Sequence, residues 1–483
     1  MTTVLAIDIG TSVTRASAVT LDGVVVAAAS ARSAASVAGN KATANTHALW
    51  ADLCGLIADV VAHAGRPLAV GVAAQLGTVL ADKALEPVGE ALLWQDRRAA
   101  SEAAELADLL TGRAYELAGR GSAAELTAPR LMWMARHQPA EWDRARWCLS
   151  LKDYIVARLT GTVATDPTSA SYSLLFDVRR RMWSDELAAA ANVPVDRLPP
   201  VLAAFEACGT ISERAAAPTG LAPGIPVAVG GPDGTVGVLG AGAGEAGITV
   251  DVAGTTDVIL HTTDRPVNDP SQRTALSAYL LPGLWTVGGP TGLTGGAVAW
   301  LSALLGHSSV DRTYRELGVA LATIEPGAAG LSFHTALSGE RFPTWASDRA
   351  GSLSGIRPEH TPAHVLRAAE EGAAFTVRRG LEALEALDLP VGEIRVSGGL
   401  AKSEEAMRLR ANALGRAVVG ASASDATTIG SAVLAAICAG VYDRADQAID
   451  AMVRVEPAVV PDPTTTAAYD AAYRRWHEAA PTT

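Results

Sequence analysis

The sequence predicts an α/β fold of two domains that hold a ligand between them, and three observations support this. The chain has 483 residues, more than one hydrophobic core usually holds. Apolar residues make up 49% of it and charged residues 19%, which is typical of a globular chain and not of a disordered one. One short pattern, an apolar strand, an Asp, a Gly with hydroxyl residues and a second apolar strand, occurs once in each half. We therefore expect domains at residues 1–243 and 244–483.

The overall charge excludes two classes of partner. A net charge of −12 and a pI near 5.3 argue against a nucleic-acid or anionic-membrane surface, since both need clustered Lys and Arg. Phosphate sites are compatible with this acidity, because they use backbone N–H groups and bound Mg²⁺. The four cysteines show no C-x-x-C spacing, so we expect them to be reduced and free of zinc.

Two segments are candidates for a targeting or membrane-spanning element. Residues Met1–Gly10 contain no basic region and only a short apolar run, so we expect a cytoplasmic protein without a signal peptide. Residues Thr274–Val310 lack any Asp, Glu, Lys or Arg and are long enough to span a bilayer. Two prolines, and six glycines between Gly283 and Gly296, interrupt this stretch, which favours a strand, a loop and a helix start instead.

The first copy of the pattern opens the chain. A short apolar strand carries Asp8, a tight Gly10-Thr11-Ser12 turn follows, and an alternating run covers Arg15–Val19. A further run, Val24–Ala28, comes after the turn Leu21-Asp22-Gly23, which is a hairpin signal.

A stretch that crosses the middle of the chain combines several features. Asp233 follows the apolar run Pro226–Val229 in a Gly-Gly-Pro-Asp-Gly turn, where rigid backbone would expose a general base. The glycine-rich residues Gly237–Gly247 predict a hinge or domain seam. The strand Ile248–Ala253 then breaks into a Gly254-Thr255-Thr256 turn, which offers N–H groups and hydroxyls to a phosphate. Glycine-rich turns are also common without any function. The similarity of this stretch to the one at the amino terminus is what indicates a functional site. Two such loops predict duplicated domains with ATP between two facing phosphate loops.

The order of further motifs resembles the FGGY family of carbohydrate kinases, within the actin-like, ribonuclease H-like (ASKHA) fold group, over essentially the whole chain. The DxGTxxxR pattern falls on Asp8, Gly10, Thr11 and Arg15, and the family's catalytic Asp falls on Asp233. Later blocks resemble the GERxP, EGxAF and GGxxKS motifs, at Leu337–Trp345, Glu370–Phe375 and Val396–Ser403. The resemblance implies two actin-like domains with a nucleotide and sugar cleft between them.

The resemblance also implies a role for each motif. Asp8 would hold Mg²⁺, partly through water. Asp233 would accept the proton of the attacking sugar hydroxyl. The nucleotide would contact the two phosphate loops, the start of a helix at Ala297–Leu305 and an adenine-side turn, through Gly10, Thr11, Ser12, Arg15, Gly254, Thr255, Thr256, Gly295, Ala299, Gly398, Gly399 and Ser403. For the glycines, ordinary turn chemistry is the alternative.

The sugar side departs from the family pattern. Where xylulose kinases usually have GQMH, this chain has Ala74-Gln75-Leu76-Gly77, which weakens a xylulose assignment. The WxDxR motif is kept at Trp94, Asp96 and Arg98, so an apolar wall and two hydroxyl-binding groups are expected, with a strand-end salt bridge as the alternative for the charged pair. Trp345 is closer to gluconate kinases. We expect ATP-dependent phosphorylation of a ketopentose such as xylulose first, and of gluconate or another polyol second.

Two rival classes remain in view. An actin-like ATPase without a sugar substrate would keep the phosphate loops but not the GERxP and EGxAF blocks. A sugar-binding pseudokinase or regulator is supported only by the altered Gln75–Gly77 loop. The sequence leaves the oligomeric state open, a homodimer included.

Overall fold

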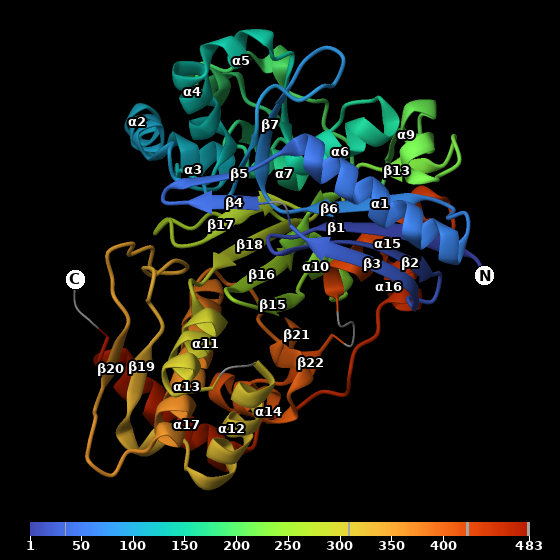
Figure 1. Cartoon of the computed structure of the whole chain (residues 1–483). Helices are drawn as coiled ribbons and strands as arrows, with labels where there is room; N and C mark the ends of the chain where they lie inside the picture. Colours follow the sequence, from blue (N-terminus) through green and yellow to red (C-terminus); the bar gives the residue numbers. More distant parts are fainter. Residues whose placement is uncertain (34, 308–309, 422–424, 481–483) are drawn as a thin grey trace.

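Two mixed β-sheets, one in each half of the chain, form the framework of the molecule (Figure 1). The computed structural model describes residues 1–33, 35–307, 310–421 and 425–480. The first sheet has the order β12-β13-β6-β1-β2-β3, with β14 beside β6, and the second has the order β17-β18-β16-β15-β21-β22. The strands of the first sheet are β1 (Thr3–Ile9), β2 (Val13–Thr20), β3 (Val25–Arg32), β6 (Val70–Ala74), β12 (Ala207–Thr210), β13 (Pro226–Ala228) and β14 (Gly231–Pro232). Those of the second are β15 (Thr249–Ala253), β16 (Asp257–Thr263), β17 (Ala275–Ala278), β18 (Trp285–Pro290), β21 (Ile394–Gly398) and β22 (Val418–Gly420).

Smaller sheets and a set of helices complete the chain. A five-stranded sheet joins β4 (Ala35–Ala38), β5 (Lys41–Ala44), β7 (Gly77–Ala81), β8 (Ala91–Leu93) and β9 (Trp147–Ser150), and two pairs join β10 (Phe176–Asp177) with β11 (Met182–Trp183) and β19 (Ser332–His334) with β20 (Ser352–Ser354). The helices of the first half are α1 (Thr46–Ala64), α2 (Ala100–Leu110), α3 (Arg113–Ala118), α4 (Thr127–His137), α5 (Pro139–Arg144), α6 (Leu151–Thr160), α7 (Pro167–Ser171), α8 (Asp185–Ala190), α9 (Glu213–Thr219) and α10 (Asp233–Gly240). Those of the second half are α11 (Thr294–Leu304), α12 (Val310–Thr323), α13 (Pro362–Glu385), α14 (Glu404–Leu414), α15 (Ala426–Cys438), α16 (Ala445–Met452) and α17 (Pro463–Glu478).

The two large sheets repeat one topology. In the first, β1 pairs in parallel with β6 and antiparallel with β2, which pairs antiparallel with β3. In the second, β15 pairs in parallel with β21 and antiparallel with β16, which pairs antiparallel with β18. Each copy of the sequence pattern forms the central hairpin of its sheet, because its two apolar runs are buried and its Gly and hydroxyl residues form the turn. The repeat in the sequence is therefore a repeat in the fold.

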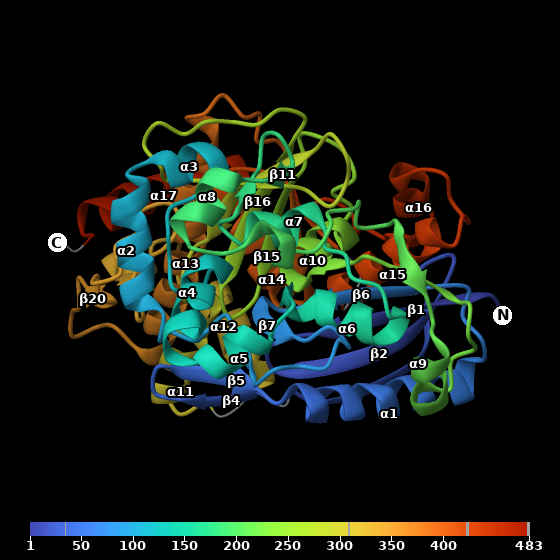
Figure 2. The same cartoon turned by 90° about the horizontal axis from the view of Figure 1, so that it is seen from above.

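Helices α10 and α15 pack together between the two sheets (Figure 2). A Cβ atom on Gly240 would lie 1.8 Å from the carbonyl oxygen of Ala426, and one on Gly430 would lie 1.9 Å from that of Val236. These glycines let the helix backbones approach closely. The sequence predicted a hinge or seam at Gly237–Gly247, but its first residues belong to α10, where the small side chains serve helix packing.

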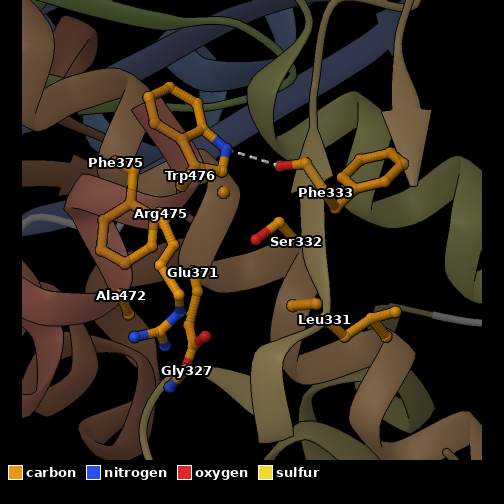
Figure 3. Close-up of a pocket in the computed structure, with 11 residues that line it drawn as sticks. Gly327, Leu331, Ser332, Phe333, Glu371, Phe375, Ala472, Arg475 and Trp476 are labelled. Carbon is orange, nitrogen blue, oxygen red and sulfur yellow. Dashed lines mark hydrogen bonds between the residues drawn. The ribbon is translucent and has the colours of Figure 1, made fainter. Parts of the chain in front are cut away.

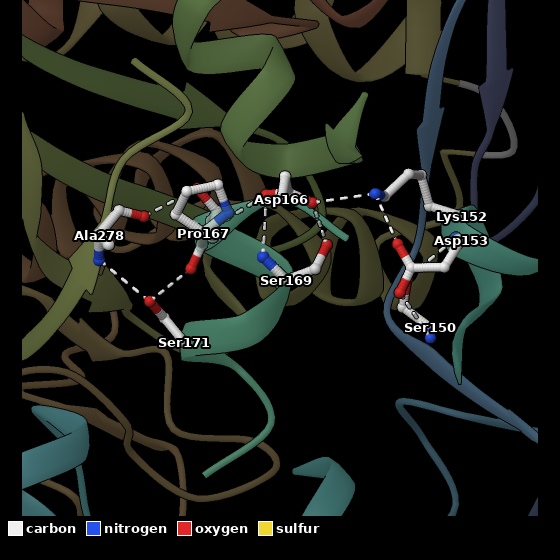
Figure 4. A network of polar contacts seen from close by, with 9 residues as sticks. Ser150, Lys152, Asp153, Asp166, Pro167, Ser169, Ser171 and Ala278 are labelled. Carbon is white, nitrogen blue, oxygen red and sulfur yellow. Dashed lines mark hydrogen bonds and ion pairs between the residues drawn. The ribbon is translucent and has the colours of Figure 1, made fainter. Parts of the chain in front are cut away.

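Part of the first half also attaches to the second sheet. Lys152, which is buried in α6, forms an ion pair with Asp166 at 3.2 Å between Nζ and Oδ1, and Asp166 caps α7 (Figure 4). Two side chains of α7 bind the backbone of Ala278: the Ser171 hydroxyl accepts a hydrogen bond from the Ala278 N–H (3.0 Å), and the Thr168 hydroxyl donates one to the Ala278 carbonyl (2.9 Å). The α7 segment thus connects the first domain to edge strand β17.

Helices α2 and α3 are separate, because Thr111 and Gly112 between them both have left-handed backbone conformations (φ 35° and 84°). Residues Thr274–Val310 contain β17, β18 and α11, as expected. None of the helices in the described ranges has the length and apolar composition that a membrane crossing requires.

Candidate active site

Three strands of the first sheet end at the same edge and bring predicted residues together. Asp8 in β1 lies opposite Ala73 in β6, and Ala73 lies opposite Gly231 in β14. These strands are parallel, so the residues that follow them emerge side by side. The backbone N–H of Gln75, after β6, donates to the carbonyl of Ile9 at the end of β1 (2.8 Å). Asp233 follows β14 directly, as the first residue of α10.

Asp8 and Asp233 form a pair of partly shielded carboxylates at this edge. Burial raises the pKa of Asp233 to about 6, although the Gly234 N–H, which donates to its Oδ1 at 2.7 Å, opposes the shift. Burial, and next the Asp233 carboxylate, raise the pKa of Asp8 to about 7, whereas Arg15 acts in the opposite direction. The Oδ1 atom of Asp8 is buried and has no hydrogen-bond partner within the part of the chain that the structure describes. A buried carboxylate oxygen without a partner, next to a second carboxylate, suits a hydrated divalent cation such as Mg²⁺.

The first predicted phosphate loop, Gly10–Ser12, is fixed on both sides. The Gly10 N–H donates to the Val13 carbonyl (3.0 Å) and closes the turn, so this amide is used internally. The Gln75 side-chain amide donates to the Gly10 carbonyl (3.2 Å), and the Trp94 indole N–H donates to the Thr11 hydroxyl (3.1 Å).

Arg15 lies across the hairpin from Asp8. Its guanidinium forms an ion pair with Asp425, whose carboxylate also caps the start of α15. This contact places the first loop's arginine beside the second half of the chain.

The second predicted loop, Gly254–Thr256, is packed by glycines from two other elements. A Cβ atom on Gly295 would lie 2.2 Å from the Gly254 carbonyl oxygen, and the Gly296 N–H donates to the Thr255 carbonyl (2.9 Å). The N-terminus of α11 therefore lies against this loop, in the orientation that favours an anion. Gly398 has φ +95°, and a Cβ atom there would lie 2.2 Å from the Ala253 carbonyl oxygen. Packing against β15 explains this glycine, and the exposed Gly399 follows it.

Arg410 in α14, which no sequence motif indicated, binds both strands that flank the second loop. Its fully buried guanidinium pairs with Asp251 (2.6 Å) and Asp257 (3.0 Å), the two carboxylates that flank the loop. Asp251 in this copy is thus paired with an internal cation through its Oδ2 atom. Its Oδ1 atom, like the Oδ1 of Asp8, has no hydrogen-bond partner among the described residues. A basic residue among the buried positions of an amphipathic helix is the pattern that could have revealed it.

The predicted sugar-side residues adjoin the Asp8–Asp233 edge. Gln75 and Leu76 connect β6 to β7, which begins at Gly77, and the Trp94 backbone N–H donates to the Leu76 carbonyl (2.9 Å). Asp96 is buried and accepts hydrogen bonds from the Ala42 N–H (2.9 Å) and from Arg98 (2.7 Å). The salt bridge considered as the alternative for Asp96 and Arg98 is therefore present, and contact of either residue with a sugar stays a prediction.

Several arginine side chains cluster on this side. Arg98 lies over the Trp133 ring, with 4.3 Å from its Cζ to the centroid. One turn before Trp133, Arg130 is 1% exposed, and its Nε and Nη2 atoms have no partner in the described ranges. Burial lowers the pKa of Arg130 to about 10, and the nearby carboxylates Asp96 and Glu125 limit the drop.

Glu125 itself is shared between two other guanidinium groups. It pairs with Arg97 at 2.6 Å and with Arg341, from the GERxP block, at 2.7 Å. The second of these contacts joins the two halves of the chain beside the sugar-side residues.

Two predicted residues and one pocket lie apart from this group. Ser403 caps α14 by accepting from the Ala406 N–H (3.2 Å), and Ala299 is on the exposed face of α11. No hydrogen bond within the described ranges joins either residue to the Asp8–Asp233 pair. The small pocket of Figure 3 lies in the second half, between α13, α17 and β19. The carboxylate of Glu371 in this pocket already accepts a hydrogen bond from the Arg367 guanidinium (2.8 Å).

Models of one protein family match both halves of the chain. The N-terminal domain of the FGGY family of carbohydrate kinases matches residues 3–240, and the C-terminal domain of that family matches residues 250–439. The chain belongs to the FGGY family of carbohydrate kinases. It is accordingly a sugar phosphotransferase, and the resemblance drawn from its motifs is confirmed.

Individual relatives agree with this family. A xylulose kinase from Lactococcus lactis is 26% identical over 402 residues, which cover 83% of this chain and 79% of the relative. A gluconokinase from Bacillus licheniformis is 27% identical over 399 residues, covering 80% and 77%. The crystal structure of xylulose kinase from Rhodospirillum rubrum superposes with a TM-score of 0.90 at 29% identity, covering 99% of this chain and 98% of that one. The predicted two-domain, actin-like fold is confirmed.

Proposed function

We propose that this kinase transfers the γ-phosphoryl group of ATP, with Mg²⁺, to a hydroxyl of a free ketopentose, with xylulose as the first substrate. The observation that carries the proposal is the strand edge at which Asp8, Asp233 and the Gly10–Ser12 loop meet. A general base, a metal-binding carboxylate and a phosphate loop are the parts that phosphoryl transfer to an alcohol needs. The relatives from L. lactis and R. rubrum, both named xylulose kinases, support the choice of sugar.

Each side chain has a defined task in this proposal. Asp233 accepts the proton from the attacking sugar hydroxyl, and its raised pKa brings it closer to the pH at which a base is most effective. Asp8 holds Mg²⁺, which neutralises charge on the phosphates when bound. Arg15 adds fixed positive charge as the transferred group becomes more negative. The phosphates are bound by the hydroxyls and amides of Thr11, Ser12, Thr255 and Thr256. The rest of the nucleotide is contacted by Gly295, Ala299, Gly398, Gly399 and Ser403.

Gluconate is the second candidate substrate, and a cluster of arginines favours it. Arg97, Arg98, Arg130 and Arg341 lie around the carboxylates of Asp96 and Glu125, so an anionic sugar would find several guanidinium groups there. The gluconokinase relative and the absence of a histidine in the Gln75–Gly77 loop agree with this candidate.

The test is release of ADP from ATP and Mg²⁺ with a panel of D-xylulose, D-ribulose, L-ribulose, L-xylulose, D-gluconate, glycerol and erythritol, against a blank without sugar. We expect D-xylulose to stimulate release well above the blank, and stimulation by gluconate alone would select the second candidate. Equal release in every sample and in the blank would contradict the proposal. Equal release would instead favour an actin-like ATPase without a sugar substrate. Sugar binding without any turnover of ATP would favour a sugar-binding regulator.

A matched pair of variants assigns the base. Asp233→Ala should lower the sugar-stimulated rate by about 10²- to 10⁴-fold, the usual contribution of a general base. Asp108→Ala removes an exposed carboxylate from α2 and should leave the rate unchanged. An Asp233→Ala enzyme with the activity of the Asp108→Ala enzyme would remove Asp233 from the mechanism.

A further inference from the structure

Trp94 makes hydrogen bonds to both sides of the candidate site. It follows β8, and its backbone N–H donates to the carbonyl of Leu76 on the sugar side (2.9 Å). Its indole Nε1–H donates to the hydroxyl of Thr11 in the first phosphate loop (3.1 Å). Both partners are half-buried, so this hydrogen bond is only partly exposed to competition from water.

The chemistry of the indole sets the direction of this hydrogen bond. An indole nitrogen is a donor and never an acceptor, so the Thr11 oxygen must accept here. The hydroxyl hydrogen of Thr11 then has to be donated to another group. In the ranges that the structure describes, no protein acceptor receives it, which leaves the hydrogen free for a bound anion.

A second contact from the sugar side holds the same loop. The side-chain amide of Gln75 donates to the Gly10 carbonyl (3.2 Å), and Gln75 is 3% exposed. The Gly10 N–H is already used within the turn, by the Val13 carbonyl. Gln75 therefore holds the Gly10 carbonyl of the loop, and Trp94 holds the Thr11 hydroxyl. The conformation of Thr11 thus depends on residues of the sugar side.

We propose that Trp94 is a positioning residue for nucleotide binding, which fixes the Thr11 hydroxyl as a donor toward a phosphate oxygen. This rests on the proposed function, in which the Gly10–Ser12 loop binds phosphate. A hydroxyl that is already oriented loses less freedom when its ligand binds, and that difference adds to affinity. Trp94 thus affects the nucleotide without touching it, beyond its predicted place as a wall of the sugar site.

The test is a double-mutant cycle on the affinity for a non-hydrolysable ATP analogue with Mg²⁺, measured by calorimetry without sugar. Trp94→Phe keeps an aromatic ring and removes the N–H, and Thr11→Val keeps the shape and removes the hydroxyl. We expect each variant to weaken binding by roughly 3- to 10-fold, the range of one hydrogen bond. The double variant should bind no more weakly than Thr11→Val alone, because Trp94 acts only through that hydroxyl.

Trp183→Phe is the matched control, since it removes an indole hydrogen bond to the Pro199 carbonyl (2.8 Å) outside this group. It should leave the affinity unchanged. Thr11→Ser keeps the hydroxyl, so Trp94→Phe must still weaken binding in that background. The Thr11→Ser background therefore tests the role of Trp94 even if the Thr11→Val variant fails to fold.

Two results overturn the proposal: an unchanged affinity in Trp94→Phe, or losses in the two single variants that multiply in the double variant. The cycle measures binding without turnover, so it is independent of the sugar assay. A coupled cycle in an enzyme that phosphorylates no sugar refutes the proposed function alone. A wild-type protein that binds no nucleotide refutes both.

Discussion

Replacing Asp233 by Asn tests two effects of this carboxylate: its contribution to the reaction rate and its cost to the stability of the folded protein. The substitution preserves shape and keeps an Oδ1 acceptor for the Gly234 N–H, so the local turn should persist. Burial raises the pKa of Asp233 from 3.8 to about 6. Each pKa unit corresponds to about 1.4 kcal/mol, so holding the group ionised in the folded state costs about 3 kcal/mol.

The sign of this effect depends on pH. The folded state holds the Asp233 proton more tightly than the unfolded state, so wild-type stability falls as pH rises from 3.8 to about 6. The Asn variant does not lose stability in this way. Its free energy of unfolding should therefore exceed that of the wild type by up to about 3 kcal/mol at pH 8, and its melting temperature should be higher by roughly 3 to 6 °C. At pH 4 the difference should shrink to about 0.5 kcal/mol.

Calorimetric melting at pH 4 and pH 8 measures the stability, and the ADP assay measures the rate. The wild-type rate should fall as pH drops through about 6, because the base becomes protonated, and the Asn variant should lose this dependence with most of its activity. Asp108→Asn controls for the loss of an exposed carboxylate. A variant that is less stable than the wild type at pH 8, or equally stabilised at both pH values, would refute the reasoning.

Three further variants test other parts of the site. Asp8→Asn should raise the Mg²⁺ concentration for half-maximal activity by roughly tenfold or more, since Mg²⁺ binds through few carboxylates; an unchanged Mg²⁺ titration would contradict this. Gly398→Ala should destabilise the protein by about 1 to 3 kcal/mol in thermal melts, because of its φ of +95° and the Ala253 carbonyl oxygen 2.2 Å from the new Cβ, whereas Gly392→Ala meets open space. Arg410→Met leaves two buried carboxylates unpaired and should cost about 3 to 5 kcal/mol in urea unfolding, and a loss no greater than that of exposed Arg408→Met would be the contrary result.

The fold could be predicted because its main features lie in local patterns. The strand, Asp, Gly and hydroxyl pattern at Asp8 and again at Asp251 fixes a hairpin each time, and the structure places both hairpins at the same position in matching sheets. The glycine-rich stretch after Asp233 was harder to interpret. Glycines permit a hinge as well as close helix packing. The glycines here serve packing because they lie against helix α15, which is far away in the sequence.

The motifs named several residues that lie at the Asp8–Asp233 edge, but only one contact among them, the salt bridge between Asp96 and Arg98. Asp8 and Asp233 are far apart in sequence, and their proximity depends on β6 lying between β1 and β14. The hydrogen bond from Trp94 to Thr11 and the pairing of Arg410 with both acids of the second loop join separate elements with no common spacing. Such contacts follow from tertiary packing, which a single sequence does not encode in any local pattern.

The most direct test of the central claim is transfer of γ-³²P from labelled ATP into a sugar, with wild type and Asp233→Ala side by side. The account predicts that wild type with Mg²⁺ forms labelled sugar phosphate from xylulose, and that the variant forms about 10²- to 10⁴-fold less. If label appears only as inorganic phosphate, or if it enters the sugar equally with both proteins, the strand edge at Asp8 and Asp233 is not the site of sugar phosphorylation.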